Sequence, residues 1–203
     1  MPSTLDRYQR IARFYDGLDE GFERRRYKPI RPQLFQGLSG RVLEAGVGTG
    51  RNIPYYPRGA TMVGIDLSPA MLARAERRRA ELNAVVELRR MDVTQLEFPD
   101  HSFDCAVATF LFCVLAEDLQ VPALRELGRV VKPGGLIRLL EYVRPTGWIR
   151  RAKARIWEPW MAWAYGAGFD RNTEARVPEA GLCIVESRFV VEDLVKLIVV
   201  RAP

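Results

Sequence analysis

The sequence predicts an α/β fold built around a mostly parallel sheet. Short apolar runs alternate with helical stretches along the 203 residues, which is the order that successive βα units produce. Apolar residues make up 48% of the chain, enough for the core of one full domain. No internal repeat or linker interrupts the alternation. We therefore predict a single domain over residues 1–203, with one insertion.

Local patterns place the elements of this domain. Residues 1–36 show helical spacing of apolar side chains and carry a basic cluster, so we expect a basic helical cap there. Ser68 is a good N-cap and Pro69 suits the first helical position, which predicts a helix over 68–83. Strands are predicted at 41–45, 61–66, 85–90, 103–109 and 136–142, a second helix at 117–131 and a tight turn at 132–135.

The regular pattern breaks after the fifth predicted strand. Residues 143–178 form an insertion in which all four tryptophans fall within sixteen positions, with basic side chains between them. Two apolar runs follow, at 181–191 and 194–200, joined by Glu192 and Asp193. This end of the chain is predicted to form a closing β-hairpin.

Charge and composition narrow the classes of function. The net charge of +6 favours anionic partners, either nucleic acid or an anionic membrane surface. There is no run of 18 apolar residues and no basic-then-apolar leader, so we expect neither a transmembrane helix nor a secretory signal. The spacing of Cys105, Cys113 and Cys183 fits no metal site or redox pair, and the one histidine, His101, lies in a predicted turn. These features predict a cytoplasmic protein with reduced thiols and no metal.

A glycine-rich loop, Glu44-Ala-Gly-Val-Gly-Thr-Gly50, directly follows the first predicted strand. Glycine lets the backbone turn sharply and lets a ligand approach closely. The spacing is G-x-G-x-G and differs from the G-x-G-x-x-G of dinucleotide sites. The loop alone also fits a purely structural turn, so the identity of a ligand has to be inferred from residues that follow the next strands.

Two carboxylates beyond the loop indicate the ligand. Asp66 ends the second predicted strand, twenty residues after Gly46, where a carboxylate accepts two hydrogen bonds from a ribose diol. Asp92 follows the third strand, in position to accept from an adenine amino group. Together with Glu44 they would crowd one crevice with negative charge. That charge repels a pyrophosphate but suits a sulfonium nucleoside, so the pattern favours S-adenosylmethionine over NAD.

At these residues the chain resembles the class I S-adenosylmethionine-dependent methyltransferases, especially the branch that includes quinone-biosynthesis enzymes. The likeness covers about residues 38–143 and the terminal hairpin. It implies a three-layer, Rossmann-like fold with a seven-stranded sheet whose last strand is antiparallel. The motifs that carry it are Leu43-Glu-Ala-Gly-Val-Gly-Thr-Gly50, Val63-Gly-Ile-Asp-Leu-Ser-Pro-Ala-Met71, Phe98-Pro-Asp-His-Ser-Phe-Asp104 and Val131-Lys-Pro-Gly-Gly135.

The resemblance also assigns a cofactor site. It implies that the glycines line the methionine part, that Asp66 binds the ribose, and that Asp92 binds the adenine between apolar side chains. Phe110 and Cys113 match a stretch that flanks both cofactor and substrate, for which plain packing is the alternative. The expected cofactor residues are Glu44, Gly46, Gly48, Gly50, Asn52, Asp66, Leu67, Met71, Asp92, Val93, Phe110 and Cys113.

One segment departs from the commonest family pattern. In Asn52-Ile-Pro-Tyr-Tyr-Pro57 the two prolines allow only a short helix after the glycine loop. This resembles a subgroup that contains lipid and thiol methyltransferases. Asn52 is then a candidate ligand for the methionine carboxylate.

Methyl transfer from a sulfonium mainly requires alignment and a water-poor site. An amine acceptor, with a pKa near ~10, must also lose its proton before it attacks. Tyr15 matches an N-terminal tyrosine that lies across the cofactor in this branch, and Glu141 ends the fifth strand at the same rim. We expect both to be catalytic, with core packing the alternative for Tyr15 and a surface ion pair for Glu141.

The insertion indicates a membrane-bound acceptor. Tryptophan mixed with arginine suits a bilayer interface, and an aromatic pocket would hold a methylated ammonium by cation–π attraction. The whole chain resembles small bacterial phosphatidylethanolamine N-methyltransferases, which implies a phospholipid substrate and a peripheral position on the inner face of the membrane. A lid packed on the protein's own core is the alternative. The expected substrate and membrane residues are Tyr142, Trp148, Trp157, Trp160, Trp163, Arg24, Arg25 and Arg26.

Other acceptors remain open at this point. A quinone precursor, a thiol or another small hydrophobic molecule fits the same core. A nucleic-acid methylase typically carries an Asn/Asp-Pro-Pro-Tyr-like element after the fourth strand, where this chain has Ala108-Thr-Phe-Leu-Phe-Cys113, so we expect no nucleic-acid partner. A non-catalytic lipid-binding module would require a broken cofactor loop, and this loop is intact. We assume a monomer.

Overall fold

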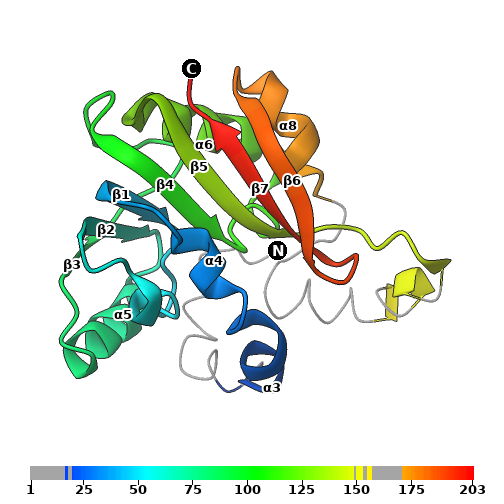
Figure 1. Ribbon diagram of the computed structural model, residues 1–203, viewed down its shortest axis with the longest axis horizontal. Coiled ribbons are helices and arrows are strands. Elements are labelled where there is room, and N and C mark those ends of the chain that lie inside the picture. Colours follow the sequence, from blue (N-terminus) through cyan, green and yellow to red (C-terminus); the bar gives the residue numbers. More distant parts are fainter. Residues whose placement is uncertain (1–16, 18–19, 149, 153–154, 157–170) are drawn as a thin grey trace.

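A computed structural model describes residues 17, 20–148, 150–152, 155–156 and 171–203. Its centre is one seven-stranded sheet, shown in Figure 1. The strands are β1 (Gly40–Ala45), β2 (Ala60–Asp66), β3 (Val86–Arg90), β4 (Phe103–Thr109), β5 (Val131–Tyr142), β6 (Cys183–Val191) and β7 (Val195–Arg201). The helices are α3 (Glu20–Phe22), a π-helix (Glu23–Tyr27), α4 (Arg31–Phe35), a 3₁₀ helix (Ile53–Tyr55), α5 (Pro69–Glu81), α6 (Glu117–Val130) and α8 (Thr173–Glu179).

The strand order is β3-β2-β1-β4-β5-β7-β6. Strands β1 to β5 pair in parallel, and β7 runs antiparallel to both β5 and β6. The predicted seven-stranded sheet with an antiparallel last strand is therefore confirmed. From β1 the chain adds β2 and β3 toward one edge of the sheet, and then β4 and β5 toward the other edge. The strand order therefore reverses between β1 and β4. Open α/β sheets bind ligands at such a reversal, beyond the carboxyl ends of the strands.

Helices cover both faces of the sheet and produce the three layers. Figure 1 shows α4 in front of the sheet and α6 and α8 behind it. Leu34 and Phe35 of α4 pack in the core of one face, whereas Leu124 and Leu127 of α6 pack against Ile137 on the other. Burying a side chain of this size contributes about 2 kcal/mol. The two apolar cores thus fix the sheet that supports the pocket.

Helix α5 begins as the sequence predicts. The Ser68 hydroxyl accepts a hydrogen bond from the Met71 N–H at 3.4 Å, and Pro69 occupies the first turn. The helix covers Pro69–Glu81, within the predicted range of 68–83. The N-cap matters for the site because it brings the start of α5 next to the carboxyl end of β2.

Strand β5 starts earlier than expected. The tight turn predicted at residues 132–135 is instead part of the strand, as an irregular segment that shifts the register against β4 between Phe103 and Cys105. Gly134 has a φ of +75°; its N–H donates to the Ala202 carbonyl at 3.2 Å, and the Gly135 carbonyl accepts from the Ala202 N–H at 2.9 Å. The glycines thus make a bulge whose partner, Ala202, lies just after β7 and is not visible in a local sequence pattern.

Helix α8 occupies the end of the predicted insertion. The Asn172 side chain accepts from the Ala175 N–H at 3.4 Å and caps this seven-residue helix. Val177 is fully buried in the core on the α6 side of the sheet. The insertion predicted over residues 143–178 did not anticipate this helix. The helix is too short for a clear periodic signal.

The described helices include none with both the length and the apolar character needed to cross a bilayer.

Candidate functional site

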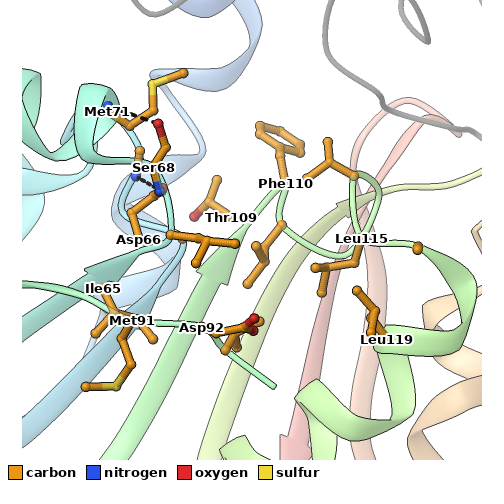
Figure 2. Close-up of a pocket in the computed structure, with 17 residues that line it drawn as sticks. Ile65, Asp66, Ser68, Met71, Met91, Asp92, Thr109, Phe110, Leu115 and Leu119 are labelled. Atoms are coloured by element: carbon orange, nitrogen blue, oxygen red, sulfur yellow. Dashed lines mark hydrogen bonds between the residues drawn. The ribbon is translucent and has the colours of Figure 1, made fainter. Parts of the chain in front are cut away.

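A cavity opens at the carboxyl ends of β2 and β4, beside the glycine loop, where the strand order reverses (Figure 2). In Figure 2, Phe110, Leu115 and Leu119 lie across it from Asp66 and Ser68. The residues that line it are Gly46, Gly48, Ile65, Asp66, Leu67, Ser68, Met71, Met91, Asp92, Val93, Thr109, Phe110, Leu111, Val114, Leu115, Ala116 and Leu119.

The glycine loop turns tightly at Gly46. Its φ is +72°, and a Cβ there would lie 3.0 Å from Cδ1 of Leu111. The N–H groups of Gly46 and Val47 both donate to the Ile65 carbonyl at 2.9 Å, which fixes the loop to β2. Glycine is therefore required for both conformation and space.

Asp66 is the central polar group of the cavity. Its carboxylate accepts from the Gly48 N–H at 2.9 Å and from the Ser68 N–H at 2.8 Å. Burial raises the pKa of this carboxyl, while the two N–H donors act in the opposite direction. An ionised carboxylate has about four acceptor positions. Two remain for a ligand, which is the number that the two hydroxyls of a ribose require.

Asp92 supplies a second carboxylate at the end of β3. One oxygen, Oδ1, accepts from the N–H and the hydroxyl of Thr94 at 2.8 and 2.7 Å, which orients the side chain. Apolar side chains surround the two acids, and none of the seventeen lining residues is a lysine or arginine. The cavity therefore suits a cationic nucleoside such as S-adenosylmethionine and disfavours a pyrophosphate.

Most of the expected cofactor residues lie in this cavity. The structure brings together Gly46, Gly48, Asp66, Leu67, Met71, Asp92, Val93 and Phe110. Several further residues that line the cavity were not predicted. Most of them lie next to a predicted cofactor residue in the sequence, and that position is the signal that could have found them. The sequence analysis also missed Leu119, which only the packing of α6 brings to the site. The missed residues are Ile65, Ser68, Met91, Thr109, Leu111, Val114, Leu115, Ala116 and Leu119.

Gly50 and Cys113 were expected in the cavity but do not line it. A Cβ on Gly50 would lie 2.6 Å from Ile53 and 3.2 Å from the Ala75 backbone, so this glycine allows α5 to approach the loop. Cys113 is buried, and its Sγ donates to the Phe110 carbonyl at 3.3 Å. Both residues support the site through packing.

Glu44 and Asn52 also lie outside the cavity, with only 1% and 2% of their surfaces exposed. The Asn52 amide donates to Glu44 Oε1 at 2.6 Å, and the Tyr56 hydroxyl donates to the other Glu44 oxygen. Burial raises the pKa of Glu44 to about 7, against the effect of these hydrogen bonds. Glu44 therefore lies behind the crevice, and Asp66 and Asp92 are the two carboxylates that line it.

Asn52 joins the cavity wall to the N-terminal cap. Its amide nitrogen also donates to the Thr109 hydroxyl at 2.9 Å, and its oxygen accepts from Arg31 at 2.7 Å. Arg31 in turn pairs with both oxygens of Glu23, at 2.6 and 2.7 Å, and Arg51 reaches Glu23 at 3.0 Å. These contacts use the oxygen and both amide hydrogens of Asn52, so in this arrangement none remains for a ligand carboxylate.

Glu141 lies beneath the loop that follows β4, with 1% of its surface exposed. Its carboxylate accepts from the N–H groups of Leu111, Phe112 and Cys113 at 3.0, 2.9 and 3.0 Å. Burial raises the pKa of Glu141 to about 7, and these N–H groups oppose that shift. The side chain does not line the cavity and is not in a surface ion pair, so this geometry is at odds with both roles considered from the sequence.

An aromatic cluster of Tyr27, Phe110 and Tyr142 adjoins the cavity at Phe110. The rings of Phe110 and Tyr142 are stacked with centroids 4.6 Å apart, and Tyr27 meets both edge-on at 5.1 and 6.0 Å. The Tyr142 hydroxyl donates to that of Tyr27 at 2.5 Å. The sequence predicted Tyr142 as a substrate residue and gave no signal for Tyr27, because only the fold of the N-terminal cap brings Tyr27 to Tyr142.

Some expected residues lie at the described surface or beyond it. Arg24, Arg25 and Arg26 are exposed on the π-helix, and Trp148 is 79% exposed. Arg26 lies 3.8 Å from Glu192 of the terminal hairpin. Tyr15, Trp157, Trp160 and Trp163 lie outside the described residues.

Comparisons with known proteins agree with this geometry. A family model described as a methyltransferase domain matches residues 42–135. A phosphatidylethanolamine N-methyltransferase of Cereibacter sphaeroides is 39% identical over 140 residues, which covers 66% of this chain and 68% of the relative.

Two further relatives differ from it in their named substrates. A demethylmenaquinone methyltransferase of Renibacterium salmoninarum is 36% identical and matches 52% of this chain and 43% of its own length. The human thiol S-methyltransferase TMT1B is 32% identical, matching 64% of this chain and 49% of its own length. The chain thus spans about half the length of these two relatives.

Solved structures share the fold at low sequence identity. A SAM-dependent methyltransferase from Methanosarcina mazei aligns with a TM-score of 0.67 at 20% identity, covering 85% of this chain and 96% of that one. The seven-stranded arrangement is thus that of known methyltransferases.

Proposed function

The chain belongs to the S-adenosylmethionine-dependent methyltransferase family, and we propose that it methylates the headgroup amine of phosphatidylethanolamine and of its partly methylated forms. One observation carries the proposal beyond the family. The acidic cavity, whose described lining has no basic residue, adjoins the aromatic cluster of Tyr27, Phe110 and Tyr142. The relative at 39% identity is named for this substrate.

The residues of the cavity fit the cofactor. When bound, S-adenosylmethionine would supply a sulfonium methyl group: a neutral amine attacks the methyl carbon, the C–S bond breaks to leave the thioether S-adenosylhomocysteine, and the methylated ammonium then loses a proton. Asp66 would hold the ribose through its two free acceptor positions, and Asp92 would accept from the adenine amino group. Leu67, Met71 and Val93 would enclose the ring and exclude water. An apolar enclosure favours transfer because the positive charge, which is concentrated on sulfur in the cofactor, is spread between sulfur and nitrogen in the transition state.

The aromatic cluster would hold the acceptor. Ring faces attract an ammonium by about 0.5–2 kcal/mol, and more strongly where water is excluded. The cluster would therefore favour the headgroup amine and its methylated products over a neutral quinone. Tyr15 remains our proposed group for orienting or deprotonating the amine, which has a normal pKa near ~10.

We propose that the basic cap docks the protein on the anionic inner surface of the membrane. Changing Arg24, Arg25 and Arg26 to glutamine should weaken binding to anionic vesicles roughly 100-fold at low salt, since each basic residue near such a surface contributes about 1 kcal/mol. The loss should shrink at high salt because the attraction is screened. Vesicle flotation measures both effects.

A matched control removes the same charge elsewhere. Arg58, Arg77 and Arg201 are also exposed, and their triple glutamine variant should bind vesicles like the wild type. Equal losses in the two triple variants would show that only net charge matters, and would count against a docking surface on the cap.

A quinone precursor or a thiol is the second candidate acceptor, favoured by the apolar lining of the cavity and by two of the relatives. The deciding assay incubates the protein with labelled S-adenosylmethionine and a panel of phosphatidylethanolamine, its mono- and dimethyl forms, demethylmenaquinone, an alkyl thiol and RNA. We expect label in the three lipids. Label in the quinone or the thiol alone would refute the lipid substrate, but the chain would still be a methyltransferase.

A further inference from the structure

The loop after β4 forms one wall of the cavity. Five of the seventeen lining residues come from this loop and the turn that leads into α6. Its first residue, Phe110, has a φ of +54°, a region that bulky side chains rarely adopt. A conformation of this kind persists only where surrounding contacts impose it.

The contacts that impose it come from Glu141. The N–H groups of Leu111, Phe112 and Cys113 converge on its carboxylate at 2.9 to 3.0 Å. Successive N–H groups that follow a residue with positive φ form a concave nest for an anion. Hydrogen bonds to an ionised acceptor are about twice as strong as neutral ones.

The sheet places this carboxylate beside the loop. Thr109, the last residue of β4, pairs with Leu140 of β5, so Glu141 comes one position later, where β4 has already ended. The Phe110 N–H donates to the Leu140 carbonyl at 2.8 Å, and this bond starts the loop. Glu141 itself does not line the cavity, so it acts through the loop.

We propose that Glu141 is a positioning residue whose carboxylate holds residues 110–113 in the shape that binds S-adenosylmethionine. The loop also contacts the opposite wall, since Leu111 fills the space beside Gly46. A shift of the loop would therefore change both sides of the cavity. The inference rests on the proposed function only for the identity of the cofactor, because cofactor binding needs no acceptor.

Glu141→Gln is the direct test, because it keeps the size of the side chain and removes the charge. Its amide NH₂ would face at least one of the three loop N–H groups, donor against donor. We expect S-adenosylmethionine affinity, measured by calorimetry, to fall at least tenfold. Hydrogen exchange at residues 111–113 should become at least tenfold faster, while Ile198 and Val200 of β7 stay protected. Affinity within twofold of wild type in the folded variant would overturn the proposal.

Two further variants keep the test decisive. Glu87→Gln removes an exposed carboxylate that pairs with Arg89 on β3, away from the loop, and should bind cofactor like the wild type. Glu141→Asp keeps the charge but withdraws it by one methylene, so its affinity should lie between wild type and Glu141→Gln. If Glu141→Gln does not fold, weaker binding by Glu141→Asp supports positioning, and wild-type binding by Glu141→Asp overturns it. A wild-type protein that binds cofactor but methylates no lipid would refute the proposed acceptor alone.

Discussion

Replacing Asp66 by alanine is expected to weaken S-adenosylmethionine binding by at least about 100-fold. The variant removes the acceptor for two ribose hydroxyls, and hydrogen bonds to a charged group contribute about 1.5–3 kcal/mol each. It also leaves the N–H groups of Gly48 and Ser68, now bound at 2.9 and 2.8 Å, without their acceptor. The glycine loop and the start of α5 would lose a shared anchor. Calorimetric titration measures the loss directly.

Two comparisons make this result specific. Asp66→Asn keeps the shape and one acceptor oxygen, so its affinity should fall between those of the wild type and Asp66→Ala. Glu97 is an exposed carboxylate that does not line the cavity, and Glu97→Ala should leave the affinity unchanged. Wild-type affinity in Asp66→Ala would remove the basis for placing a nucleoside in this cavity.

Replacing Arg31 by methionine is expected to reduce the free energy of unfolding by about 3 kcal/mol or more, the cost of breaking a buried ion pair by removing one partner. The Arg31 side chain is 5% exposed and lies between Glu23 and Asn52. Without it, Glu23 keeps Arg51 as its one ion-pair partner among the described residues, and the Asn52 oxygen loses its Arg31 donor. Because Asn52 also holds Thr109, the change should reach the cavity wall. Urea denaturation followed by circular dichroism measures the loss.

Two controls separate the buried network from general charge effects. Arg24→Met removes an exposed arginine from the same cap and should change stability by less than about 0.5 kcal/mol. Adding Glu23→Gln to Arg31→Met should recover part of the loss, since a neutral amide is less costly to bury than an unpaired carboxylate. A loss below about 1 kcal/mol in Arg31→Met would place the pair among ordinary surface ion pairs.

Local patterns were sufficient for most strands, for α5 and for the ligand edge of the sheet. Each of these depends on nearby residues: a run of apolar side chains, a cap such as Ser68, or an acid at the end of a strand such as Asp66. The predicted turn at 132–135 and the missing helix α8 failed for the opposite reason. Both have partners far along the chain: Ala202, just after β7, for the turn, and the core beside α6 for the helix.

The carboxylates show the same division between sequence and structure. The sequence by itself determined the methyltransferase family, the parallel sheet and the places of Asp66 and Asp92, because glycine spacing and strand ends are local properties. Only the tertiary structure shows what Glu44, Asn52 and Glu141 contact. Each is polar and next to the site in sequence, yet buried contacts with Tyr56, Arg31 or the loop at 111–113 use its hydrogen-bonding groups. A buried polar group must be paired, and which partner it finds depends on segments that meet only in the folded chain.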